Sequence, residues 1–128
     1  MLIFLSALGF ALSCLAYLST FTAWNAPNTV LVLHPGIILV FAPAVWRQRT
    51  LIPKGSRFSW GKLLRGCPGW MVTNLYLIFA FAMISFVITV AHEPLIEVRA
   101  FSGHWMIFYY ASLCIHVSYR NVMRGAGR

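Results

Sequence analysis

Residues 47–69, "RQRTLIPKGSRFSWGKLLRGCPG", carry six basic side chains and no acidic one. Apolar runs flank this stretch on both sides, at 29–46 and 70–91. Each run approaches the roughly 20 residues that an α-helix needs to cross a bilayer. The sequence therefore predicts a basic loop that connects two membrane-spanning helices.

Two further apolar runs lie outward of this central part, at 1–24 and 101–119. The chain is 60% hydrophobic and only 9% charged, whereas soluble domains carry about 25% charged residues. We therefore expect an all-α integral membrane protein, a bundle of four transmembrane helices that forms a single membrane domain over 1–128. Tryptophans near the ends of the runs fit an aromatic belt at the headgroups: Trp24, Trp46, Trp70 and Trp105.

The positions of the charges predict the orientation of these helices. Arg99 lies between the third and fourth runs, together with both acids, Glu93 and Glu97. The other nine basic residues fall in the loop 47–69 or after residue 119. By the positive-inside rule the loop and both termini are cytoplasmic, as in a bacterial inner-membrane protein. The net charge of +8 is thus interpreted as a topology signal, and no nucleic-acid partner is expected.

Inside the basic loop, three apolar residues fall at helical spacing beside two basic ones: Trp60, Leu63 and Leu64, with Lys62 and Arg65. This pattern is typical of a segment that lies in the interface against anionic lipid headgroups. A solvated loop, interrupted by prolines and glycines, is the alternative. The residues themselves leave both interpretations open.

Small residues recur at every third or fourth position of the first run: Ser6, Gly9, Ser13, Ala16 and Thr20. Such a stripe lets helices approach closely in a membrane, so we expect a packing seam. Because the run has no basic residue before it, we do not expect it to be a cleaved signal peptide.

The second run contains Pro35, Gly36 and Pro43. Proline lacks the N–H that would bond to the carbonyl four residues earlier, and it disfavours helical geometry in the preceding residue. We therefore expect this helix to be kinked or broken. A simple kink is favoured over a binding site at the break.

Three histidines are candidate metal or haem ligands at the outer end of the bundle. His34 and His104 lie at similar depth, and His92 borders the same face near Glu93 and Glu97. Imidazole binds zinc, copper, iron and nickel, and two imidazoles can ligate haem iron. No HxxxH or HxxE spacing supports such a site, so no cofactor is predicted and the arrangement in space has to decide.

The fourth run carries an aromatic and polar stripe at helical spacing, with Tyr109, Ser112 and His116 at its centre and Trp105 and Arg120 at its ends. Such a stripe faces other helices or a water-filled cavity rather than lipid. His116 is interpreted as a histidine that is hydrogen-bonded near a helix end. Ionisable groups inside a membrane are also functional candidates.

Three functions are compatible with these features. A small structural or accessory membrane subunit, packing with itself or with a larger partner, is favoured by the small-residue seam. An oligomeric transporter or channel is the first alternative, but no acid lies within any run. A haem- or metal-binding redox protein that uses the outer histidines is the second. No nucleophile and base are paired by spacing, so the sequence does not support enzymatic activity.

Overall fold

The computed structural model describes residues 1–22, 32–92 and 97–127. The described residues form five helices: α1 (Leu2–Ser19), α2 (Leu33–Thr50), α3 (Trp60–Leu63), α4 (Gly69–His92) and α5 (Glu97–Ala126). The all-α prediction is confirmed for this part of the chain. Two of the helices, α1 and α4, are long and apolar enough to cross a membrane.

A helix occupies each of the four apolar runs, but two helices extend several residues beyond the predicted bounds. α2 continues past residue 46 into the basic loop and ends at Thr50. α5 begins before residue 101 and continues past residue 119 to Ala126. Hydropathy marks only the apolar part of a helix, whereas arginine, methionine and glutamine also favour helical backbone. Polar helix ends are therefore invisible to a hydropathy argument.

α2 is not broken at either proline. Pro35 falls in the first turn of the helix, which begins at Leu33, and the N–H groups of a first turn have no intrahelical acceptor. Pro43 lies inside the helix, and the helical backbone continues through it to Thr50. The part of the predicted span at 29–31 lies outside the described residues.

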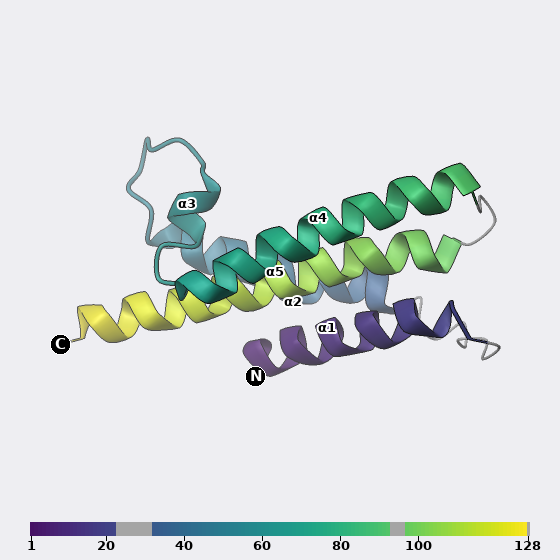
Figure 1. Cartoon of the computed structure of the whole chain (residues 1–128). Helices are drawn as coiled ribbons and strands as arrows, with labels where there is room; N and C mark the ends of the chain where they lie inside the picture. Colours follow the sequence, from purple (N-terminus) through teal and green to yellow (C-terminus); the bar gives the residue numbers. More distant parts are fainter. Residues whose placement is uncertain (23–31, 93–96, 128) are drawn as a thin grey trace.

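α5 is the central helix of the bundle. It packs against α1, α2 and α4, while α1 and α2 contact one another less extensively. Figure 1 shows α5 running between the other long helices, with the N-terminus, α3 and the C-terminus toward one end of the molecule. The fully buried side chains of α5 include Ser102, Trp105, Ser112, Cys114, Ile115 and Ser118. The helix is thus covered on several faces.

The short helix α3 packs into the protein. Ser59 caps it, because its Oγ accepts a hydrogen bond from the Lys62 N–H at 3.3 Å. Leu63 and Leu64 are buried in a core cluster together with α4 and α5 residues, whereas Trp60 is exposed. Neither of the two interpretations left open by the sequence, an interfacial segment or a solvated loop, accounts for the two buried leucines. The leucines stabilise the fold, and the tryptophan remains on the outside.

The stripe of small residues on α1 forms a seam in the bundle. Ser6, Gly9, Ser13 and Ala16 are buried, and Thr20 is half-buried. The hydroxyls of Ser6 and Ser13 donate to the carbonyls four residues earlier, Leu2 and Gly9, at 2.9 and 2.7 Å. Both hydroxyls are therefore hydrogen-bonded within α1 and need no partner in another helix. The small side chains of the seam then allow a neighbouring helix to approach closely.

Arg99 joins the start of α5 to the end of α1. Its guanidinium donates to the Oγ1 and the carbonyl of Thr20 at 2.9 and 3.0 Å, and lies 4.0 Å from the centroid of the Phe21 ring. A guanidinium at a helix C-terminus satisfies carbonyls that have no partner within the helix. This contact accounts for the one basic residue that the charge pattern places away from the others.

Candidate functional site

The outer histidines His34 and His104 face different neighbours. His34 Nδ1 accepts a hydrogen bond from Trp105 Nε1 at 3.1 Å. His104 Nδ1 donates to the Ala100 carbonyl of its own helix at 3.1 Å, and its ring packs edge-on against Phe86 of α4 at 5.3 Å. His34 is thus directed along the α2 side of α5, and His104 toward α4. The structure does not bring the two rings together.

The other candidate ligands at the outer end of the bundle do not form a metal site among the described residues. His92 is exposed at the last position of α4, and Glu93 and the Glu97 side chain lie outside the described residues. Within residues 1–22, 32–92 and 99–127, no three or more His, Cys, Asp or Glu side chains gather where they could hold a metal ion. Burial raises the pKa of the Cys67 thiol, which favours the protonated thiol over the thiolate that binds metals.

Tyr109 is held between two glycines of neighbouring helices. A Cβ atom added at Gly9 of α1 would fall onto the Tyr109 ring, and one added at Gly36 of α2 would meet its hydroxyl. The hydroxyl donates to the Leu33 carbonyl at 2.6 Å. Both glycines therefore make room for this ring, which fastens α5 to α1 and α2 at once. The sequence pattern marked Gly36 only as part of a proline-containing segment.

His116 is buried and bonded to α2. Its Nε2 lies 3.0 Å from the Val40 carbonyl, and since a carbonyl only accepts, Nε2 carries the proton. Val40 lies in the turn before Pro43, which is one N–H donor short because proline has none. The carbonyl left without that donor is the one of Leu39, four residues before Pro43, so the bond from His116 to Val40 adds a contact between α5 and α2 next to it. We expected His116 to lie near a helix end. α5 instead continues for almost three further turns after it.

A second junction, which sequence reasoning missed, is centred on Ser118. Its Oγ accepts hydrogen bonds from Gln48 Nε2 at 3.1 Å and from the Gly66 N–H at 2.9 Å. Asn121 Nδ2 donates to the Gly66 carbonyl at 3.0 Å. One hydroxyl of α5 thus joins the end of α2 to the segment after α3. The only signal in the sequence was a serine two residues after His116, and serine is too common in apolar helices to single out.

Substituting Ser118 by alanine is expected to lower the free energy of unfolding by about 1–3 kcal/mol, because the buried Gln48 amide and the half-buried Gly66 N–H lose their acceptor. The measurement is thermal unfolding of the purified protein in detergent, followed by circular dichroism. Ser112→Ala is the matched control, since its buried hydroxyl donates to Phe108 of its own helix at 2.7 Å. Equal losses for the two variants would show that Ser118 does not act as a junction.

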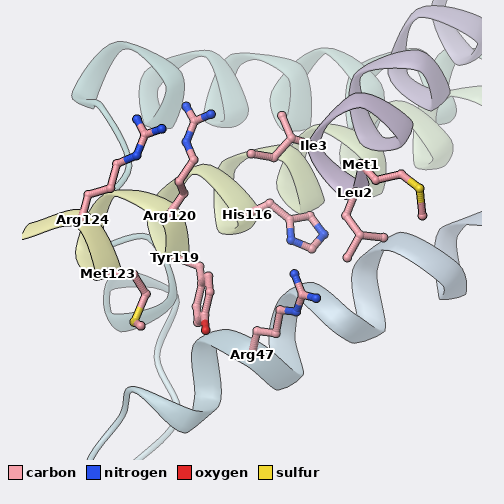
Figure 2. A pocket seen from close by; sticks show the side chains of 9 residues that line it. All are labelled: Met1, Leu2, Ile3, Arg47, His116, Tyr119, Arg120, Met123 and Arg124. Atoms are coloured by element: carbon pink, nitrogen blue, oxygen red, sulfur yellow. The ribbon is translucent and has the colours of Figure 1, made fainter. Parts of the chain in front are cut away.

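A pocket of about 430 Å³ opens at the end of the bundle that holds the N-terminus. Leu2 and Ile3 of α1 line it together with Arg47 of α2 and five residues of α5: His116, Tyr119, Arg120, Met123 and Arg124. Figure 2 shows the Arg47 guanidinium pointing toward the His116 ring, whereas the side chains of Arg120 and Arg124 extend side by side from α5, away from Arg47. We call this site the basic pocket.

The basic pocket combines residues that the sequence places far apart. Arg47 begins the basic loop, whereas Arg120 and Arg124 belong to the end of α5, four residues apart on one face. The charge pattern predicted that these groups share one side of the protein, but not that they line one pocket. An arrangement of this kind suits an anion, since guanidinium groups present paired donors to phosphate or carboxylate oxygens.

Proposed function

We propose that this chain is a four-span membrane protein whose two termini and basic loop are cytoplasmic. The distribution of side chains supports this placement. In the most apolar windows of α1 and α4, only 28% and 17% of the residues are buried. A core helix of a water-soluble protein would be buried over most of its length, whereas a helix that faces lipid exposes its apolar side chains.

The surface of the bundle is rich in large apolar side chains, and its interior holds several small polar ones beside the apolar core. Serine side chains with no exposed area lie inside: Ser6, Ser13, Ser102, Ser112 and Ser118. Large apolar side chains lie outside, including Phe4 and Leu15 of α1, Ile38 and Leu39 of α2, and Ile84 and Val87 of α4. Membrane helices associate through small and polar residues because lipid already satisfies the apolar ones. Exposed large apolar side chains around buried serines are the observation that carries the proposal.

Within the membrane, we propose a structural or accessory role, in which the bundle packs with a second copy or a larger protein. The polar stripe of α5 supports a packing role, because each of its central groups has a partner in the protein. Tyr109 bonds to Leu33, Ser112 to Phe108 and His116 to Val40. A path for ions or solutes needs polar groups that face water instead.

Cysteine labelling tests the orientation. In a background with the three native cysteines replaced by alanine, we expect His92→Cys on intact cells to react with a membrane-impermeant maleimide. Ser56→Cys, in the exposed part of the basic loop, is expected to react only after permeabilisation. The reverse pattern would place the loop outside the cell and contradict the proposed topology.

The accessory role has its own test. After purification in a mild detergent, we expect a complex larger than one 14.4 kDa chain, either with a second copy or with a partner at constant stoichiometry. A stable lone monomer by native mass measurement would contradict this role. Uptake of a solute by liposomes containing the pure chain would favour transport in its place.

A further inference from the structure

We propose that the basic pocket binds the phosphate group of an anionic phospholipid. This inference rests on the proposed membrane placement and names the partner that the cytoplasmic end of the bundle meets there. Three features of the pocket support this inference. Its arginines lack a carboxylate partner among the described residues, apolar side chains line it beside the arginines, and it lies next to an exposed tryptophan that suits the headgroup level.

The part of the chain that the structure describes holds no acidic side chain beside the arginines of the pocket. The only acids of the chain are Glu93 and Glu97. Glu97 begins α5, so about 35 Å of helix separates it from Arg120, several times the screening length of about 8 Å at physiological salt. The guanidinium groups of Arg47, Arg120 and Arg124 make no hydrogen bond or ion pair with the part of the chain that the structure describes.

Three like charges around one pocket repel each other unless an anion joins them. Arg120 and Arg124 are one turn apart, where two guanidinium groups lie as neighbours on the helix surface. A phosphate accepts several charge-assisted hydrogen bonds from such groups and removes the repulsion. All three side chains are exposed, so they can close on a ligand without rearranging the core.

The rest of the pocket fits a lipid better than a free phosphate. Leu2, Ile3 and Met123 line it beside the arginines, which provides an apolar surface for the glycerol backbone and the first acyl carbons. Trp46, 71% exposed and adjacent to Arg47, suits the headgroup level of a bilayer. Basic pockets between helices on the cytoplasmic side are known recognition sites for anionic headgroups.

Native mass spectrometry of the full chain in mild detergent tests the proposal. The protein is titrated separately with phosphatidylglycerol, phosphatidylcholine and glycerol 3-phosphate. We expect phosphatidylglycerol to be retained in preference to phosphatidylcholine, and the double variant Arg120→Gln/Arg124→Gln to weaken its retention about tenfold or more. Arg47→Gln is a second variant that removes one pocket charge from a different helix, and it is expected to weaken retention as well.

The matched control is Lys54→Gln/Arg57→Gln, which removes two charges from the exposed loop outside the pocket. It is expected to retain the lipid as the unaltered protein does. An equal loss in the control, or equal retention of phosphatidylcholine, would overturn the site by showing attraction to overall charge or to any lipid. If glycerol 3-phosphate bound as tightly as the lipid, the proposal of a lipid site would be wrong, and the pocket would be a site for a soluble phosphate.

Failure of this inference is distinguishable from failure of the proposed function. Reversed cysteine labelling would contradict the topology, while the lipid titration in detergent reports on the pocket itself. Expected labelling together with unchanged lipid retention in the arginine variants would contradict only the pocket. Circular dichroism of each variant shows whether the helices are intact.

Discussion

Gly9→Ala is expected to lower the free energy of unfolding by about 2–3 kcal/mol, although it adds a single methyl group. The added Cβ would fall onto the ring of Tyr109, whose side chain is only 3% exposed. The ring has no room to withdraw, because Gly36 and the Leu33 carbonyl hold its hydroxyl from the other side. The methyl group therefore pushes α1 away from α5. Unfolding by a denaturing detergent measures the loss.

Gly125→Ala is the control for this prediction. Both glycines lie within helices, but a Cβ at Gly125 meets nothing within 4 Å. There the higher helix propensity of alanine is expected to leave stability unchanged or raise it by up to about 1 kcal/mol. In a Tyr109→Ala background the cost of Gly9→Ala should vanish, since the ring is gone. A cost that persists in that background would refute the contact as its cause.

Trp105→Ala is expected to produce the largest loss of stability, about 3–5 kcal/mol. Trp105 is 1% exposed and packs in a core cluster with Ala16 of α1 and Val40 of α2. Its removal would leave a cavity where three helices meet and deprive His34 of its donor. Trp46→Ala is the control, because that ring is exposed, and we expect only a small change. Thermal unfolding in detergent compares the two variants.

A double-mutant cycle separates the two roles considered for His34. Trp105→Phe and His34→Ala each remove one side of the 3.1 Å hydrogen bond between Trp105 Nε1 and His34 Nδ1. If this bond is the role of His34, the effects of the two substitutions are non-additive by at least about 0.5 kcal/mol. Strictly additive effects would mean that His34 serves something other than Trp105, and would reopen the ligand hypothesis.

Trp105 also shows where sequence reasoning was incomplete. Its position near the end of an apolar run suggested a headgroup belt, while its place on the α5 stripe suggested contact with other helices. The structure buries it, so the stripe was the better guide. Periodicity reports which side of its own helix a residue occupies, whereas distance from the end of a run reports membrane depth only when the ring faces outward.

The basic loop gives a second example. The spacing of Trp60, Leu63 and Leu64 correctly indicated a helical turn, but a pattern of apolar residues does not say what covers them. In the structure the leucines are covered by α4 and α5 residues. Protein and lipid are equally apolar to a leucine side chain, so the sequence alone had no means of choosing between them.

The sequence by itself determined the properties that belong to a single segment. These are the four long helices, the small-residue seam of α1 and the polar stripe of α5. Length, hydropathy and the 3.6-residue period act within one helix, so they can be worked out from the chain. Only the tertiary structure decided that α5 is central, that His34 and His104 diverge, and that Arg47 shares a pocket with Arg120 and Arg124. These depend on how helices rotate and slide against each other. That choice is made by contacts between distant residues, such as one tyrosine ring between two glycines.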